Sequence, residues 1–342
     1  MSTRYIGPVL RALVVAGALA ASLYAVTAPF AAGSVEVAEM RYLASPNRVL
    51  FPELAEDLGY LGALSLKPVG DATGGPQALQ AVVTGDADFG SSFNGSLLNL
   101  RAAKAPLKAV VSYYGTDKET WRGIYVRDDS PIRSPRDLVG KKIAVNTLGA
   151  YFEFIIKEYL ARNGIGQDDI KKVTLVPMPF ASTEQALRQG IIDAAVLEDI
   201  FREKAVARGG VRLLFNDFDL FGPFQVATIA VHEKFLKNNP NASRVFVEGT
   251  ARAIEWTREH PREEVIARFK EIIRKRARRN ETTDIIEYWL SPGVGIKGGV
   301  IQEREFTVFY EWLVANGQIK AGQIDPRSAY TNEFNPYRSP QQ

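Results

Sequence analysis

Two short stretches decide the fold: residues 85–90 read GDADFG, and residues 190–195 read GIIDAA. Each follows an alanine-leucine pair that fits a helix, and each continues as a glycine stop, an aspartate and a short apolar strand. A similar unit of strand, small or polar turn and helix precedes each stretch, starting at residues 37–43 and at residues 142–145. The repeated unit predicts two α/β halves, and we expect a cleft for a small molecule between them.

The alternation of strand and helix patterns predicts a mixed sheet in each half, covered by helices on both faces. After residue 232 the pattern is helical only, and we expect this tail to pack on the first half. The chain is expected to cross between the halves near residues 114–125 and 221–228. The predicted domains are a signal peptide at 1–33, a first lobe at 34–122 plus 228–342 that includes the helical tail, and a second lobe at 123–227.

The N-terminus has the pattern of a secretory signal. Arg4 and Arg11 form a basic start, residues 12–28 carry no charge, and small residues follow at 31–34. The alternative is an uncleaved membrane anchor, because the apolar run approaches spanning length. No cysteine follows the run, which excludes a lipoprotein anchor. We therefore expect a cleaved signal and a periplasmic mature protein.

Composition excludes several kinds of chemistry. The 342 residues include no cysteine, so disulfides, thiolate metal sites and a cysteine nucleophile are excluded. The only two histidines, His232 and His260, lack metal-ligand spacing, and no nucleophile turn is present. A net charge of +3 gives no case for nucleic acid, and the basic run at 274–279 favours a solvated helix face. We expect no catalysis, no cofactor and no metal.

Residues 137–145 read DLVGKKIAV. This stretch resembles the DLxGKKIAV segment of type II periplasmic solute-binding proteins of ABC importers, and the two stretches quoted first resemble the G-x-x-D-A strands of that family. The branch that it resembles most serves importers of nitrate, sulfonate, taurine and thiamine-pyrimidine. The resemblance covers nearly the whole mature chain. It implies an α/β fold with two lobes, each a mixed five-stranded sheet flanked by helices, a ligand in the cleft, and delivery to an ABC permease in the inner membrane.

Ligands of open α/β sheets bind beyond the carboxyl ends of the strands. Four junctions in this sequence have that position, and three of them lead into a helix whose free N–H groups favour an anionic head group. The side chains at these junctions also fit the simpler role of helix N-caps, while the resemblance favours ligand contact for the second and third groups. The candidates are Ser45 and Asn47; Ser91, Ser92 and Phe93; Thr147, Leu148, Gly149 and Ala150; and Glu198.

Aromatic and polar residues near the expected hinges complete the candidate site. Phe93 and Phe224 are predicted to cover an organic body, whereas Tyr42 and Tyr151 fit core packing equally well. Gln225 either hydrogen-bonds the ligand or bridges the lobes. The negative charge of Glu198 would weaken the binding of an anion unless a cation compensates that charge. It either accepts a hydrogen bond from a ligand amine or ring N–H, or forms an ion pair with Arg122 or another base.

The resulting hypothesis is a monomeric exported receptor that captures a small anionic organic solute by lobe closure and delivers it to the permease. A sulfonate or taurine-like compound is the first choice, and nitrate is less favoured because the aromatic residues indicate an organic body. One alternative is a thiamine-pyrimidine-type or other heterocyclic nutrient. Another is the pyrimidine-synthesis enzyme of the same family, whose cysteine-rich motif is absent here. A third alternative is the ligand-sensing domain of a transcription regulator. It would need a helix-turn-helix module, and the signal peptide stands where that module would be.

Overall fold

Ten strands form two sheets in the described part of the chain. The computed structural model describes residues 34–276, 278 and 281–339, so the predicted signal peptide at 1–33 lies outside the described residues. The strands are β1 (Glu39–Ala44), β2 (Ser65–Asp71), β3 (Phe89–Phe93), β4 (Leu107–Thr116), β5 (Arg122–Arg127), β6 (Lys142–Val145), β7 (Thr174–Pro177), β8 (Ala194–Glu198), β9 (Val211–Asn216) and β10 (Phe224–His232).

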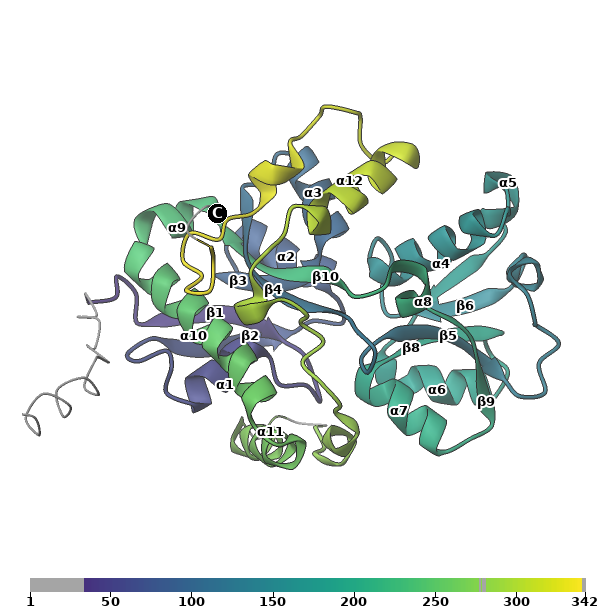
Figure 1. Cartoon of the computed structure of the whole chain (residues 1–342), viewed down its shortest axis with the longest axis horizontal. Helices are drawn as coiled ribbons and strands as arrows, with labels where there is room; N and C mark the ends of the chain where they lie inside the picture. The colour runs from purple at the N-terminus through teal and green to yellow at the C-terminus, as the bar shows by residue number, and fades with distance from the viewer. Residues whose placement is uncertain (1–33, 277, 279–280, 340–342) are drawn as a thin grey trace, which may run out of the picture. The chain divides into compact units, whose positions relative to one another are not determined.

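Both sheets are mixed and five-stranded, as predicted. The first has the order β2-β1-β3-β10-β4 and the second the order β7-β6-β8-β5-β9 (Figure 1). In each sheet the neighbours of one strand run antiparallel to it: β10 opposes β3 and β4, and β5 opposes β8 and β9. These are the strands that the chain enters after changing sheet, from β4 to β5 and from β9 to β10. The two halves are therefore linked by two crossing segments.

The borders of the predicted lobes stay a prediction. The first crossing lies between Thr116 and Arg122, and the second lies between Asn216 and Phe224. Phe224 already pairs with Thr116 in the first sheet, ahead of the predicted border at 227/228.

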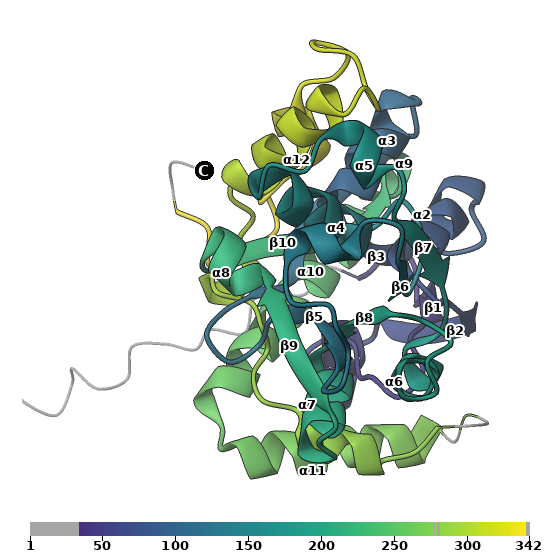
Figure 2. The same cartoon turned by 90° about the vertical axis from the view of Figure 1, so that its right-hand side faces the viewer.

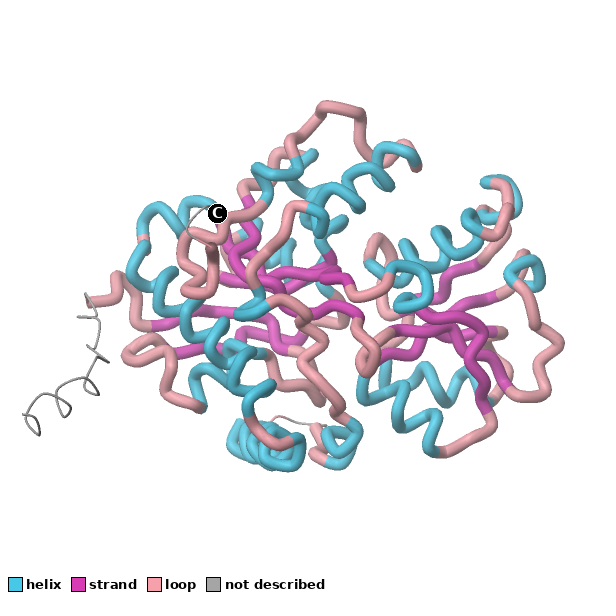
Figure 3. Tube along the Cα trace, in the orientation of Figure 1, coloured by secondary structure: helices cyan, strands magenta, loops and turns pink. Residues whose placement is uncertain are grey.

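Helices flank both sheets (Figure 3). α2 and α3 lie on one face of the first sheet and α1 and α10 on the other, whereas α4 and α6 lie on opposite sides of the second sheet (Figure 2). Within the described residues, no helix is long and apolar enough to cross a membrane. The helices are α1 (Phe51–Asp57), α2 (Gly75–Thr84), α3 (Asn94–Ala102), α4 (Tyr151–Arg162), α5 (Gln167–Ile170), α6 (Phe180–Arg188), α7 (Asp199–Ala207), α8 (Asp217–Phe221), α9 (Glu233–Asn238), α10 (Pro240–Glu259), α11 (Arg262–Arg276) and α12 (Arg304–Ala315), with 3-10 turns η1 (Pro135–Leu138), η2 (Asp284–Tyr288), η3 (Lys297–Gly299) and η4 (Pro326–Ala329).

The repeated glycine–aspartate motif has the same structural role in both halves. Gly85 and Gly190 follow α2 and α6 with φ of 83° and 70°, a conformation that glycine adopts without strain. Each motif also contains an aspartate that accepts a backbone hydrogen bond from the neighbouring parallel strand. Asp88 accepts a hydrogen bond from Arg41 N at 2.7 Å, and Asp193 accepts one from Lys142 N at 2.8 Å. Each motif thus ends a helix and fixes the neighbouring parallel strand, which explains why it marks the fold.

The tail packs on the first sheet through an apolar core. Phe246 of α10 contacts Phe89 of β3 with ring centroids 4.7 Å apart, and both side chains are almost fully buried. Ile254 and Met40 belong to the same cluster. Burial of a large apolar side chain contributes about 1.5–3 kcal/mol, so this contact surface anchors the tail.

Some predicted element bounds are wrong. β3 extends to Phe93 instead of ending at Gly90, because β10 pairs with it as far as Ala227–Phe93. Ser182 and Gln185 have the spacing of a capping box, but α6 begins after Pro179, so Ser182 lies inside the helix and no capping box forms there. Pairing and packing with distant segments override these local signals.

We expect the stability of the protein to depend on pH because of the buried carboxyl group of Glu305 on α12. Its side chain is buried and accepts a hydrogen bond from Ser112 Oγ at 3.0 Å. Burial raises the pKa of Glu305 from 4.5 to about 7. Because the folded pKa is the higher one, stability should fall as pH rises from about 4.5 to about 7, by roughly 3 kcal/mol. Urea titrations at pH 5 and pH 8 measure this loss in the free energy of unfolding. Glu305→Gln should not show it, because the variant has no carboxyl group to titrate. Glu311→Gln, a change at an exposed position, should show the same loss as the wild type. Equal pH dependence in the wild type and Glu305→Gln would contradict the assignment.

Candidate ligand site between the two sheets

A cavity lies where the carboxyl ends of strands from both sheets meet, the position expected for a ligand. Its walls come from the loops after β1, β2 and β6 and from the ends of β3, β4 and β8. The residues used below are Ser45, Arg48, Gly74, Gly75, Ser91, Ser92, Phe93, Tyr113 and Tyr114 from the first half, and Asn146, Ala150, Tyr151, Phe152, Phe180 and Glu198 from the second half.

The structure brings half of the predicted site residues to this cavity. Tyr151, for which core packing was an equal alternative, lines the cavity and is also buried. The predicted residues that line it are Ser45, Ser91, Ser92, Phe93, Ala150 and Glu198. Those that do not are Asn47, Thr147, Leu148, Gly149, Phe224 and Gln225.

The N-cap alternative is wrong for the polar side chains at the three strand-to-helix junctions, namely Ser45, Asn47, Ser92, Asn94 and Thr147. The residues at the N-cap positions of α1, α3 and α4 are Leu50, Phe93 and Ala150. Asn94 is the first residue of α3, and its side chain donates to Glu305 O at 2.9 Å. Ser45, Asn47, Ser92 and Thr147 are outside the N-cap positions of these helices. Cavity lining by Ser45 and Ser92 therefore needs another explanation than capping.

Asn47 faces the tail. Its backbone N–H donates to Glu281 Oε1 at 2.9 Å, and its Oδ1 accepts from Thr282 N at the same distance. Its φ of 60° is left-handed, a conformation that asparagine tolerates better than most residues. Asn47 thus fixes the strand-to-helix loop that carries Arg48.

The turn after β6 forms contacts between the halves. Ser96 Oγ donates to Gly149 O at 2.7 Å, and Asn146 Nδ2 donates to Thr73 O at 3.5 Å. A Cβ on Gly74 would lie 2.5 Å from Thr147 Cγ2, so this close approach requires glycine. Leu148 is 49% exposed and lines a separate groove beside α4.

Phe224 and Gln225 are covered by the tail. Phe224 packs against Phe309 of α12 at 5.4 Å between ring centroids. Gln225 is buried, and in the amide orientation that satisfies both groups its oxygen accepts from Gly295 N and Ile296 N. It therefore holds the tail against β10 and does not reach the cavity.

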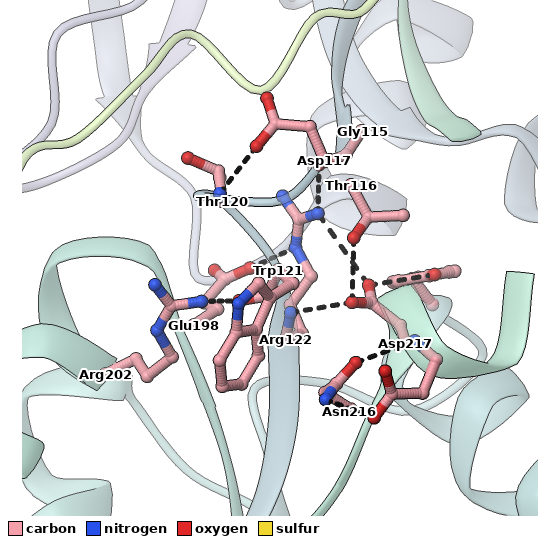
Figure 4. A network of polar contacts seen from close by, with 12 residues as sticks. Gly115, Thr116, Asp117, Thr120, Trp121, Arg122, Glu198, Arg202, Asn216 and Asp217 are labelled. Carbon is pink, nitrogen blue, oxygen red and sulfur yellow. Dashed lines mark hydrogen bonds and ion pairs between the residues drawn. The ribbon is translucent and has the colours of Figure 1, made fainter. Parts of the chain in front are cut away.

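Glu198 is held between two arginines from different parts of the fold. Arg48 Nη2 donates to Glu198 Oε1 at 2.7 Å, and Arg122 Nε donates to Glu198 Oε2 at 3.4 Å. Arg122 also lies 3.8 Å from Asp217, which accepts from Arg122 N at 2.8 Å (Figure 4). Of the alternatives for Glu198, the ion pair with Arg122 is present, and Arg48 is a second base from across the cavity. Asp199 also lies 3.9 Å from Arg48, so three carboxylates share the two arginines, and the charge of Glu198 is offset in part.

No sequence pattern marked Arg48 as a site residue, although it lies in the same loop as Ser45 and Asn47 and is the only basic residue there. Its guanidinium also lies over the rings of Phe180 and Phe201, with Cζ 5.1 and 5.6 Å from the ring centroids. Burial works against the charge, but Glu198 and Asp199 outweigh it and raise the pKa of Arg48. Arg48 is therefore a fixed cation in the wall of the cavity.

Two buried polar atoms in the cavity wall have no hydrogen-bond partner among the described residues: Arg48 Nε and Ser92 Oγ. Leaving such groups unpaired costs about 1–3 kcal/mol each, more for a charged group. The first turns of α2 and α4 also reach the cavity at Gly75 and Tyr151, and their N–H groups have no acceptor within the helix. All of these groups are hydrogen-bond donors, which is what an anion requires.

No group of histidine, cysteine or acidic side chains in the described ranges could hold a metal ion. Both unpartnered atoms at the cavity, Arg48 Nε and Ser92 Oγ, can donate hydrogen bonds.

Comparison with known proteins gives the family. The chain belongs to the family described as NMT1/THI5 like, which it matches over residues 55–264. It is similar to a protein of Escherichia coli (strain K12) assigned as an aliphatic sulfonates-binding protein, with 32% identity over 164 residues, 47% of this chain. The match spans about half of that relative's length, 49%.

Solved structures share the fold. A protein from Bordetella bronchiseptica RB50 superposes with a TM-score of 0.72 at 22% identity, covering 89% of this chain and 97% of the other. The alkanesulfonate-binding protein SsuA from Xanthomonas axonopodis pv. citri, bound to MOPS, gives 0.68 at 19% identity, covering 87% and 99%. The type II periplasmic-binding-protein fold expected from the sequence is thereby confirmed.

Proposed function

We propose that this protein is the extracytoplasmic solute-binding receptor of an ABC importer and that it captures a small organic anion, with a sulfonate as the first choice. The observation that carries the proposal is the pair of unpartnered donors, Arg48 Nε and Ser92 Oγ, in a cavity walled by both halves. The assignment of a relative to aliphatic sulfonates supports the ligand class.

A sulfonate group matches the donor set. Its three oxygens accept hydrogen bonds in different directions, so one group can satisfy Arg48 Nε, Ser92 Oγ and a helix N–H together. Arg48 and Arg122 offset part of the charge of Glu198, which reduces its repulsion of the sulfonate. Planar nitrate would satisfy some donors but would leave the aromatic wall at Phe93, Tyr151 and Phe180 without a partner.

Binding is coupled to closure in this proposal. Arg48 comes from the first half and Glu198 from the second, so their ion pair spans the cavity. A ligand that contacts both walls favours the closed arrangement, and the population shifts toward it. The permease in the inner membrane would then receive the loaded, monomeric, periplasmic protein. The proposal includes no catalytic step and no cofactor.

The test is binding of ethanesulfonate to the wild type and to Ser92→Ala. Ethanesulfonate at 100 times its dissociation constant should stabilise the protein by about 2.7 kcal/mol, measured as a rise in melting temperature. Ser92→Ala should weaken binding about tenfold, since a hydrogen bond to a charged group is worth about 1.5–3 kcal/mol. The unliganded melting temperature should not fall, because Ser92 Oγ has no partner to lose.

Ser65→Ala is the matched control, since Ser65 Oγ is exposed and bonds to Ala38 O away from the cavity. It should bind ethanesulfonate like the wild type. The proposal is wrong if no organic anion raises the melting temperature, and the site is wrong if Ser92→Ala and the wild type bind with equal affinity.

A further inference from the structure

A second cavity adjoins the first and shares three wall residues with it: Arg48, Tyr113 and Tyr114. Its other walls come from α1, from the first crossing, from the start of α7 and from the tail, which contributes Phe269 on α11 and Trp289 after η2. No pattern in the sequence connects Phe269 or Trp289 with a ligand. The tail thus supplies part of a chamber next to the anion site.

Aromatic side chains form one part of the wall of this second cavity, beside the charged groups of Arg48, Arg122 and Asp199. Phe51 and Tyr113 meet edge to face with centroids 6.3 Å apart, and Phe269 and Trp289 do so at 5.7 Å. Edge and face positions of such rings favour another flat ring, which gains about 0.5–1.5 kcal/mol beyond area burial. With Tyr114 included, five of the fourteen residues that line this cavity are aromatic. A short alkyl chain would leave most of this aromatic surface without contact.

The shared residues connect the two cavities chemically. Arg48 has Nη2 engaged by Glu198 and Nε without a partner among the described residues, so Nε is available to a head group. Neither the Tyr113 nor the Tyr114 hydroxyl forms a hydrogen bond with another residue in the part of the chain that the structure describes, and burial raises the pKa of Tyr113 to about 12. Both phenols therefore stay protonated and can border a ligand that rests on Arg48.

We propose that the second cavity receives the aromatic body of a sulfonate whose head group is bound by Arg48 Nε and Ser92 Oγ. The preferred substrate class is then an arylsulfonate rather than a taurine-like compound. This inference rests on the proposed function and narrows its ligand. Trp289 and Phe269 become specificity residues contributed by the tail.

The test compares 2-naphthalenesulfonate with methanesulfonate by calorimetric titration. The wild type should bind the naphthalene compound at least tenfold more tightly, because only that ligand buries apolar area in the second cavity. In Trp289→Ala the affinity for 2-naphthalenesulfonate should fall about tenfold, while that for methanesulfonate should change less than twofold. The ratio of the two affinities is a readout that general destabilisation does not move.

Trp312→Ala is the matched control, because Trp312 packs on Phe154 and does not line the second cavity. In this control the ratio of the affinities for 2-naphthalenesulfonate and methanesulfonate should equal that of the wild type. Ile286→Phe narrows the same cavity and should lower the ratio as well, which keeps the test available if Trp289→Ala does not fold. If methanesulfonate binds and the naphthalene compound binds no better, this inference alone is wrong. If neither sulfonate binds, the proposed function is wrong.

Discussion

Replacing Arg48 with glutamine is expected to weaken sulfonate binding by about 100-fold or more. Arg48 is the charged donor of the proposed site, and its Nε is buried without a partner among the described residues. A charge-assisted hydrogen bond contributes about 1.5–3 kcal/mol, and the lost Coulomb attraction adds to it in a buried site. Since 1.4 kcal/mol corresponds to a factor of ten, about 2.7 kcal/mol corresponds to 100-fold. Calorimetric titration with ethanesulfonate measures the effect.

Two further variants separate binding from stability. Arg48→Gln alone leaves Glu198 with Arg122 as its single base, so some loss of stability is expected. The double variant Arg48→Gln with Glu198→Gln removes the unbalanced carboxylate and should recover stability but not binding. Arg48→Lys keeps the charge without a planar fork and should bind with intermediate affinity. Recovery of full sulfonate affinity in the double variant would contradict the role given to Arg48.

Asp217→Ala is expected to destabilise the protein by about 3 kcal/mol. Asp217 is fully buried at the start of α8 in the second crossing, where it accepts from Arg122 N and, at 3.0 Å, from Thr116 Oγ1 of the first crossing. Tyr151 OH, from the cavity wall, donates to it at 3.1 Å. Removing one member of a buried charged network costs about 3–5 kcal/mol, and Glu198 still compensates Arg122 in part. The melting temperature should fall by roughly 5–10 °C.

Asp219→Ala provides the comparison on the same helix. Asp219 is exposed, and its side chain bonds to Asn216 Nδ2 at 2.7 Å, so its removal should cost about 1 kcal/mol or less. Because Asp217 ties both crossings to Tyr151, Asp217→Ala should also weaken ethanesulfonate binding in calorimetric titration. Equal melting temperatures for the two variants would show that the crossings do not depend on Asp217.

The fold was predictable because local signals and long-range structure agree at the repeated motif. Gly85 and Gly190 end helices, and Asp88 and Asp193 fix the adjacent strands, so two short stretches indicate two similar sheets. The helical tail was also predictable from its periodicity. What could not be predicted was which residues join the tail to the first sheet, since contacts such as that of Phe246 with Phe89 depend on long-range packing.

The candidate site was predictable in part for the same reason. Ser45, Ser92 and Ala150 reach the cavity because strand ends meet there, which is a property of the sheet topology. Arg48 and Glu198 are 150 positions apart, so no local pattern pairs them. Phe224 was placed near a ligand because it follows a crossing, but α12 covers it with Phe309. Contacts that depend on the tail are those that the sequence did not reveal.

The central claim is that Arg48 and Ser92 hold the head group of an organic sulfonate between the two halves. A crystal structure of the protein with bound 2-naphthalenesulfonate tests it most directly. The account predicts sulfonate oxygens within hydrogen-bond distance of both Arg48 Nε and Ser92 Oγ, with the rings against Trp289. A sulfonate bound at another place in the protein, with these two atoms still unpaired, would contradict it.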